Sequence, residues 1–332
     1  MKIPRRKFIS STSLLTASTV IHDLGGLHAD NTAGLLRFGL IADIHKDVMH
    51  DADDRLRAFI AHAQQEELDF IIQMGDFCVP KPENQGFLDI WNGFERPRYH
   101  VLGNHDTDGG YKRAQTVTFL GMPSRFYSFD RGGFHFVVLD GNDRAPEHVS
   151  GYPRYIATDQ LDWLKRDLSA ATLPTLVFVH QSIERAHDGG VQNGDDVRQL
   201  LELVNADAGF KKVVACFSGH HHRDYMRKIN GIAYPQINSA SYFWVGGDYQ
   251  KVRYGEAVDK AYPWIKYTVP YKDPLFATVT LDAERNKMTL EGRRSTMVGP
   301  APWDMGKSRE AWDAATLRAE ISDRQCSIKS GA

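Results

Sequence analysis

Three consecutive histidines stand near position 220, just after an apolar segment. Residues 213–216 are all apolar and predict a buried strand, and His220, His221 and His222 follow within a few positions. Because side chains alternate along an extended backbone, His220 and His222 can point the same way while His221 points elsewhere. Two imidazoles aimed at one point suggest a metal site. A polar loop tip is the alternative for a histidine run considered alone.

Other apolar segments also end in groups that can bind a metal ion or move a proton. These segments predict strands, each followed by such groups: 35–42 by Asp43 and His45, 70–74 by Asp76, 99–102 by Asn104, His105 and Asp106, 134–139 by Asp140, and 176–179 by His180. Apolar residues recur at helical spacing over 56–63, which predicts a parallel strand–helix–strand unit. The carboxylates are therefore expected at one edge of a sheet in an α/β fold.

These residues resemble the motif blocks of the calcineurin-like metallophosphoesterase superfamily. The resemblance covers about residues 35–295, with five blocks in the family's order: Asp43-x-His45, Gly75-Asp76, Gly103-Asn104-His105-Asp106, His180 and Gly219-His220-x-His222. It implies a four-layer α/β/β/α sandwich of two mixed sheets flanked by helices. It also implies the ligands of two metal ions: Asp43, His45 and His222 for one, Asn104, His180 and His220 for the other, and Asp76 as the bridge between them.

The chemistry of this ligand set agrees with the resemblance. Two divalent cations within about 4 Å of each other repel strongly and need an anionic ligand between them, which Asp76 supplies. Neutral imidazole and amide ligands leave net positive charge for a phosphate. Nitrogen and oxygen ligands without thiolate suit two divalent or mixed-valence ions such as Mn, Fe or Zn. Such a pair lowers the pKa of a bridging water and neutralises charge on a phosphate ester.

The departing alkoxide needs a proton, and His105 is the candidate donor. It follows Asn104, and we expect Asp106 to hold its ring in one tautomer, so both His105 and Asp106 are predicted catalytic residues. A purely turn-forming role is the alternative for His105. His221 is expected either to support the metal ligands from behind or to face the substrate, and Arg223 either faces a phosphate or pairs with a carboxylate. The predicted substrate-binding residues are Asn104, His221 and Arg223.

The resemblance implies a dinuclear phosphoesterase that cleaves a small phosphodiester or phosphomonoester through attack by a metal-bridged hydroxide. Purple acid phosphatases of this family carry a tyrosine three residues after the bridging aspartate, where this chain has Val79, so the bacterial phosphodiesterase-type branch fits better. The alternatives are a hydrolase of the pyrophosphate bond in a nucleotide diphosphate and a non-catalytic metal-binding scaffold. Aromatic residues from 242 to 264 can stack on a base or form a small core of their own.

Composition limits the partners. The chain has 332 residues and a formal net charge of -2, so it has no bulk attraction for a nucleic acid polymer or an anionic membrane, and a phosphate must be held by a local site. The three cysteines, Cys78, Cys216 and Cys326, are odd in number and far apart, which argues against a disulfide framework. We therefore expect a small phosphoester as the substrate.

The N-terminus predicts export. Arg5 and Arg6 precede a weakly apolar stretch rich in serine and threonine, and residues 1–29 resemble a twin-arginine signal. The twin-arginine machinery is then the partner of the precursor, and the mature protein is periplasmic or extracellular. A basic cytosolic tail is the alternative. The apolar stretch is too short and too polar to form a stable membrane span.

The remainder, residues 30–332, is expected to form a single domain. Antiparallel strands are predicted at 225–228, 232–237, 277–282 and 287–291, with a turn at Asn230-Gly231. An irregular, aromatic-rich insertion is expected at about 240–272. A surface helix is predicted over 308–321, followed by a polar tail.

Overall fold

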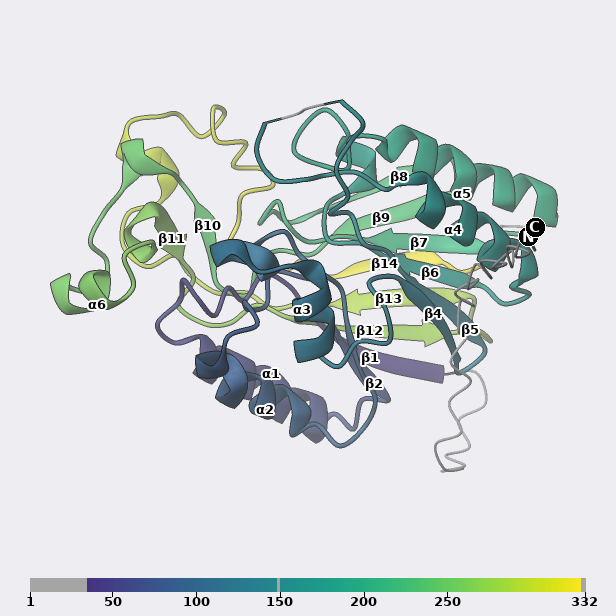
Figure 1. The fold of residues 1–332 in the computed structure, drawn as a ribbon, viewed down its shortest axis with the longest axis horizontal. Helices are drawn as coiled ribbons and strands as arrows, with labels where there is room; N and C mark the ends of the chain where they lie inside the picture. Colours follow the sequence, from purple (N-terminus) through teal and green to yellow (C-terminus); the bar gives the residue numbers. More distant parts are fainter. Residues whose placement is uncertain (1–34, 148–149, 330–332) are drawn as a thin grey trace, which may run out of the picture.

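Two mixed sheets lie face to face in the computed structural model, which describes residues 35–147 and 150–329 (Figure 1). The first sheet has the spatial order β14 (Arg324–Ser327), β13 (Lys287–Glu291), β12 (Ala277–Asp282), β1 (Leu35–Ile41), β2 (Phe70–Gln73), β3 (Arg98–His100). The second has the order β4 (Tyr127–Arg131), β5 (Phe134–Val138), β6 (Thr175–Phe178), β7 (Val213–Phe217), β9 (Ile232–Gln236), β8 (Tyr225–Ile229). The segment predicted as an export signal lies outside the described residues.

Helices cover the outer faces of the two sheets. The α-helices are α1 (Ala52–Gln65), α2 (Gln85–Asn92), α3 (Arg113–Phe119), α4 (Thr158–Ala170), α5 (Gly194–Ala208) and α6 (Glu256–Ala261). Figure 1 places α1 and α2 beside the first sheet and α4 and α5 beside the second, which confirms the predicted four-layer α/β/β/α sandwich. Within the described ranges, no helix has the length and apolar character needed to cross a bilayer.

Each sheet contains a run of neighbouring parallel strands. Strands β1, β2 and β3 run parallel, as do β5, β6, β7 and β9, and antiparallel strands extend both sheets. Helix α1 joins β1 to β2, so the predicted strand–helix–strand unit is confirmed. Parallel strands end at a common edge, which brings the loops after β1, β2, β6 and β7 together.

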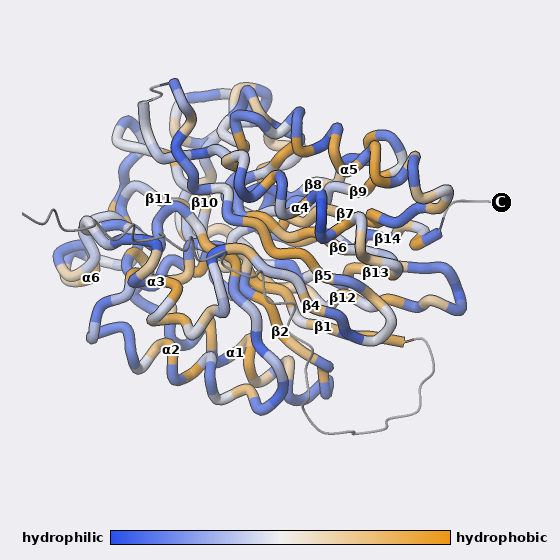
Figure 2. The backbone as a smooth tube through the Cα atoms, turned by 45° about the vertical axis from the view of Figure 1, so that its right-hand side comes forward, coloured by the Kyte–Doolittle hydropathy of each residue, from blue (hydrophilic) through white to orange (hydrophobic). Residues whose placement is uncertain are grey.

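Aromatic rings fill the space between the two sheets. Phe38 of β1 and Phe70 of β2 stack with their ring centroids 4.7 Å apart, and Phe136 of β5 meets both edge-on, at 6.0 and 5.2 Å. The next residue along β5, Val137, belongs instead to the cluster that packs with α4 and α5. This alternation is the two-residue period of a strand buried on both faces. Figure 2 shows the apolar residues concentrated along these central strands.

The C-terminal part of the chain differs from the prediction. No helix forms over 308–321, where the structure has turns, and Asp313 adopts a φ of +52°. Three backbone carbonyls there accept hydrogen bonds from side chains: Arg223 donates to the carbonyl of Trp312, and Asn238 donates to the carbonyls of Arg318 and Glu320. Strand β14 lies in the segment that was predicted to be a polar tail. The prediction also lacked β4 and α3.

The aromatic-rich insertion is more regular than expected. It contains α6 and a two-stranded antiparallel sheet of β10 (Tyr242–Trp244) and β11 (Thr268–Pro270). Its ends are fixed by Arg55 of α1, a fully buried arginine that donates to the carbonyls of Ala240 at 3.1 Å and Tyr271 at 2.6 Å. The insertion therefore has a defined position relative to the first sheet.

Candidate metal centre

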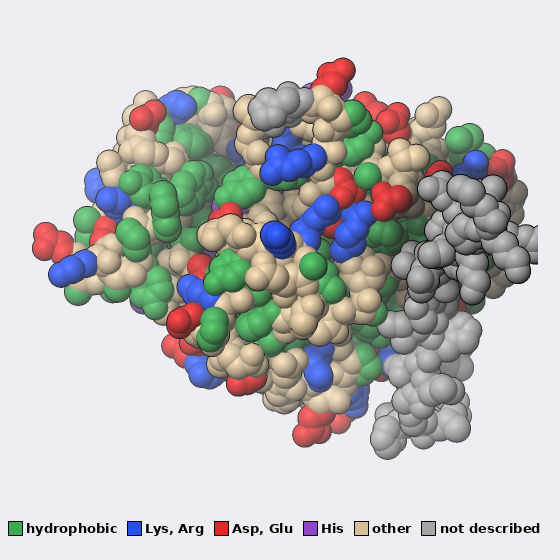
Figure 3. All heavy atoms as spheres, in the orientation of Figure 1, with side chains coloured by type: hydrophobic (Ala, Val, Ile, Leu, Met, Phe, Trp, Pro, Cys, Tyr) green, Lys and Arg blue, Asp and Glu red, His purple; other side chains and the backbone are tan. Residues whose placement is uncertain are grey.

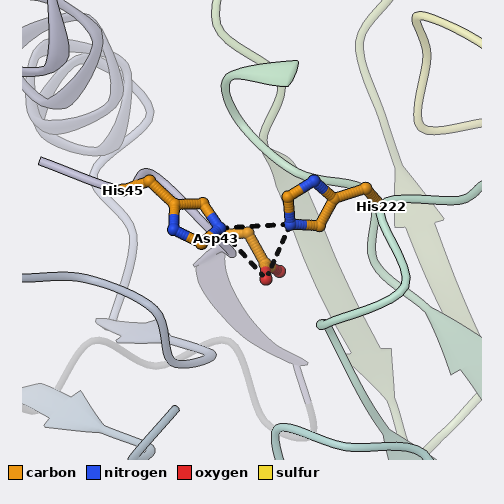
Figure 4. Close-up of side chains that lie close together, drawn as sticks. All are labelled: Asp43, His45 and His222. Carbon is orange, nitrogen blue, oxygen red and sulfur yellow. Dashed lines mark hydrogen bonds and ion pairs between the residues drawn. The ribbon is translucent and has the colours of Figure 1, made fainter. Parts of the chain in front are cut away.

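One group of candidate ligands consists of Asp43, His45 and His222, which are all buried. Asp43 and His45 follow β1, and His222 follows β7. Figure 4 shows the three side chains converging: Nε2 of His45 lies 3.1 Å from Nε2 of His222, which lies 3.2 Å from Oδ1 of Asp43. Two ring nitrogens facing each other at this distance need a proton or a cation between them, because unprotonated ring nitrogens only accept.

A second group consists of Asp76, His180 and His220, which follow β2, β6 and β7. Nε2 of His180 lies 3.1 Å from Oδ2 of Asp76, and the same oxygen lies 3.7 Å from Nε2 of His45 in the first group. The carboxylate of Asp76 is therefore between the two groups. This is the position that a bridging ligand would require.

The atoms around the second group fit a cation. Nδ1 of His180 lies 2.8 Å from the carbonyl oxygen of Met74. Because a carbonyl only accepts, Nδ1 carries the hydrogen, and the lone pair of Nε2 is left to bind a metal ion. Both polar side-chain atoms of Asn104 are buried without a hydrogen-bond partner among the described residues. Buried polar atoms normally have partners, so an amide left in this way suits coordination by its oxygen. Two divalent metal ions fit this donor set.

The backbone at the candidate ligands is held in an uncommon conformation. Five of these residues have left-handed φ values: Asp43 (52°), His45 (54°), Asp76 (52°), His220 (73°) and His222 (50°). Residues other than glycine rarely adopt this region, and such strain concentrates at functional sites. Two serines that the sequence analysis missed brace the first loop, because Ser239 and Ser241 donate through their hydroxyls to the carbonyls of Asp43 and Ile44, both at 2.8 Å.

Glycines allow the loops at the strand ends to approach one another. A Cβ on Gly103 would lie 2.1 Å from the backbone nitrogen of Asp76, and a Cβ on Gly219 would lie 2.6 Å from Oδ2 of Asp43. Both contacts are too short for any side chain. The glycines in the motif blocks are therefore required by the close packing of the candidate ligands.

The pKa shifts indicate that the centre needs positive charge. Burial lowers the pKa of His180, but Asp76 and Asp43 outweigh burial and raise it to about 10. Burial and the neighbouring His180 lower the pKa of His220 to about 3. Burial raises the pKa of Asp76, yet His180 and His105 hold it well below its ordinary value. The carboxylates thus draw a proton onto one imidazole, in a place where a bound cation would neutralise them instead.

His105 lies beside the first group, with its ring centroid 5.2 Å from that of His45. Its Nδ1 is 2.6 Å from Oδ2 of Asp108, whose other oxygen accepts a hydrogen bond of 2.9 Å from the hydroxyl of Tyr152. Burial lowers the pKa of His105, but the charges of Asp76 and Asp108 raise it to about 9. A protonated imidazole is therefore placed next to the candidate metal ligands.

The predicted pairing of Asp106 with His105 is wrong. Oδ1 of Asp106 accepts the backbone amides of Phe77 at 2.7 Å and Cys78 at 3.1 Å, and Oδ2 accepts that of Gly103 at 2.8 Å. Asp106 therefore ties the loop after β2 to the loop after β3. The partner of His105 is Asp108, because side chains three residues apart lie above one another in a 3-10 turn, whereas adjacent side chains diverge. This spacing was visible in the sequence and was missed.

The candidate ligands open onto a cavity of about 1050 Å³, at the upper end of the range for small-molecule sites. His221 and Arg223 line it, together with members of both groups. Nε2 of His221 is buried without a partner among the described residues, and burial lowers the pKa of this ring well below its ordinary value. Arg223 pairs with Asp313 at 3.4 Å, so of the two expected roles the pairing with a carboxylate is the one observed.

The chain is similar in sequence to known phosphoesterases. The family model for calcineurin-like phosphoesterases matches residues 36–224. A 3′,5′-cyclic-nucleotide phosphodiesterase from Nostoc sp. is 24% identical over 217 residues, which cover 64% of this chain and 76% of the relative. A manganese-dependent ADP-ribose/CDP-alcohol diphosphatase from Oryza sativa subsp. japonica is 25% identical over 265 residues, with 60% of this chain and 81% of the relative covered.

The fold also matches solved structures. A dimetal phosphatase from Danio rerio superposes with a TM-score of 0.56 at 16% identity, and the match covers 81% of this chain and all of that structure. At this identity the similarity concerns the arrangement of sheets and helices. It agrees with the sandwich described above.

Proposed function

We propose, from the premise that this chain belongs to the calcineurin-like phosphoesterase family, that it uses two metal ions to hydrolyse a small phosphodiester or phosphomonoester. Membership of this family makes the chain a hydrolase of phosphoric ester bonds, and our proposal concerns the substrate. The observation that carries the proposal is that two adjacent groups, Asp43, His45 and His222 and Asp76, His180 and His220, converge beside one cavity, which members of both groups line. Complete retention of these groups argues against a non-catalytic scaffold.

Each residue has a part in the proposed mechanism. Asp43, His45 and His222 would hold one ion, Asn104, His180 and His220 the other, and Asp76 would contact both. When bound, such a pair of ions supplies Lewis acidity and stabilises the charge that develops on a phosphate. His105 has Nδ1 engaged by Asp108, so Nε2 is the atom that can give a proton to the departing oxygen. Asp108 and Tyr152 hold the ring in this orientation.

The charges at the cavity bear on the class of ester. Arg185 and Arg223 both line the cavity, and either would suit a second phosphate. Arg185 is paired with Asp188, and Arg223 is paired with Asp313. These ion pairs reduce the positive charge available to bind a second phosphate. Figure 3 shows basic and acidic side chains interspersed on the face it displays. These pairings favour a substrate with a single phosphate. Hydrolysis of a pyrophosphate bond is the second candidate, favoured by the similarity to the rice diphosphatase.

The test is a substrate panel on the purified protein reconstituted with Mn(II). We expect turnover of bis-p-nitrophenyl phosphate or p-nitrophenyl phosphate above that of ADP-ribose. His180→Ala should abolish turnover, whereas His187→Ala, a matched change at an exposed loop histidine, should not. A preference for ADP-ribose would support the second candidate. A folded protein without turnover in Mn, Fe, Zn or Co would indicate a scaffold.

A further inference from the structure

Two tryptophans of the insertion are unusually exposed. Trp244 is 44% exposed and Trp264 is 57% exposed, although tryptophan is normally well buried. Tyr249, Tyr254 and Tyr262 of the same insertion pack against the main core. Figure 3 shows hydrophobic side chains gathered at the end of the molecule that carries β10 and β11. Formation of a small core therefore explains most aromatic residues of the insertion, but not Trp244 and Trp264.

Both tryptophans line the cavity that contains the candidate metal ligands. Tyr267 lies between them, with its ring centroid 5.7 Å from that of Trp244 and 5.7 Å from that of Trp264, at interplanar angles of 31° and 42°. We call these three residues the aromatic ridge. Trp244 pairs with Thr268 across β10 and β11, which fixes the position of the aromatic ridge. Arg253 also stabilises this two-stranded sheet, because it donates to the carbonyl of Thr268 at 2.7 Å.

Strand β10 sets the distance from the ridge to the candidate metal centre. Tyr242, the first residue of β10, has its ring 4.9 Å from that of His45 and 5.0 Å from that of His222. Trp244 is two residues further, so it projects from the same face of the strand about 7 Å beyond Tyr242. The ridge therefore lies about one sugar-sized spacer from a phosphate that would bind beside His45 and His222.

We propose that Trp244 and Trp264, held in place by Tyr267 between them, form a binding subsite for the base of a nucleotide, joined through its sugar to the phosphate at the metal centre. This inference rests on the proposed function and specifies its substrate class. Flat aromatic side chains gain stacking energy from any planar ring, and bases stack on them with little dependence on sequence. The cavity of about 1050 Å³ accommodates a nucleotide, whereas a phosphate alone would leave most of it unfilled.

The experiment measures binding rather than turnover. Isothermal titration calorimetry on the Mn-loaded protein would compare the methylene phosphonate analogues of AMP and of ribose 5-phosphate, which share the sugar and the anion and differ in the base. The AMP analogue should bind about 5-fold to 150-fold more tightly, which corresponds to a contribution of about 1–3 kcal/mol from stacking of one base on an aromatic side chain. Trp244→Ala and Trp264→Ala should remove most of this difference. Phe210→Ala, at an exposed aromatic residue outside the cavity, should keep it.

Several outcomes would overturn the inference. The first is equal dissociation constants for the two analogues. The second is a base preference that survives both tryptophan substitutions. The third is equally tight binding of butyl phosphonate, which would make the ridge a general apolar surface. Turnover of bis-p-nitrophenyl phosphate, measured in parallel, separates this inference from the proposed function. Turnover without a base preference contradicts only the subsite. A base preference without turnover of any ester contradicts only the proposed function.

Discussion

Oδ2 of Asp108 lies 2.6 Å from Nδ1 of His105, three residues earlier in the chain, and Asp108 stands at the kink that follows the 3-10 turn begun by His105. Tyr152 reaches the pair from a different loop and donates to Oδ1 of Asp108. The ring of His105 is thereby held in one tautomer, with Nε2 available on its other side. The orientation of the proposed proton donor depends on this contact and not on the neighbouring Asp106.

Removal of His105 should affect substrates according to their leaving group. We expect His105→Ala to lower kcat by about 100-fold on an alkyl phosphoester and to change kcat little on a p-nitrophenyl ester, because p-nitrophenolate departs without a proton. Steady-state kinetics on the two esters would measure this difference. The metal content of the variant should equal that of the wild type. Unchanged turnover of the alkyl ester would remove His105 from the mechanism.

Asp108 should act through His105. We expect Asp108→Asn to lower kcat on the alkyl ester by about 10-fold, with the same insensitivity on the p-nitrophenyl ester, and Asp108→Glu to restore part of the loss. Asp106→Asn is the contrasting variant: because Asp106 accepts three backbone amides, its loss should lower the melting temperature without a dependence on the leaving group. An equal loss on both esters for Asp108→Asn would show that its role is only structural.

The sequence predicted the candidate ligands at the strand ends better than the side chains that hold those ligands in place. Asp43, Asp76 and His180 each follow a mainly apolar segment, and such segments predict buried strands. The bracing hydroxyls of Ser239 and Ser241 were not predictable, because their partners lie far away in the sequence and depend on the left-handed loop after β1.

Long-range contacts also explain the errors at the C-terminus. Positions 308–321 have helical composition, but the carbonyls of Arg318 and Glu320 bond to Asn238, so tertiary contacts replace the helix. Strand β14 alternates weakly and gains its hydrogen bonds from β13. Neither contact has a local sequence signal. The spacing of His105 and Asp108 did have one, since residues three apart meet in a tight turn.

Metal binding should stabilise the folded protein, because the candidate ligands converge only in the native state. A ligand at 100 times its Kd adds about 2.7 kcal/mol of stability, so addition of Mn(II) to chelator-treated protein should raise the melting temperature by several degrees. In Asn104→Ala the increase should be smaller, since one candidate ligand of the second metal ion is lost. His187→Ala should respond like the wild type. A melting temperature independent of Mn(II), Zn(II) and Fe(II) would contradict the metal centre.

The export prediction concerns residues outside the described part of the chain and is tested in cells. Replacing both Arg5 and Arg6 by lysine should stop export through the twin-arginine route and leave the precursor in the cytoplasm. Fractionation followed by immunoblotting would locate the protein. As the matched control, Lys2→Arg preserves the charge and leaves the pair intact. Full export of the double variant would contradict the signal assignment.

His135 is a buried group away from the metal centre whose pKa links stability to pH. Its Nδ1 lies 2.6 Å from Oδ1 of Asp130, and its Nε2 lies 2.8 Å from Oδ2 of Asp167. Burial lowers its pKa, but the bonds to Asp167 and Asp130 outweigh burial and raise it above its ordinary value. The folded protein therefore binds this proton more tightly than the unfolded chain does.

The sign of the pH dependence follows from this raised pKa. The stabilisation from protonated His135 is fully present below the unfolded pKa of about 6.5 and is lost as pH rises through the higher folded pKa. Urea unfolding with excess chelator, which removes any contribution of metal ions, should therefore show a larger loss of unfolding free energy for His135→Gln at pH 6 than at pH 9. His187→Ala should show no such difference. An equal loss at both pH values would mean that His135 is uncharged between its two carboxylates.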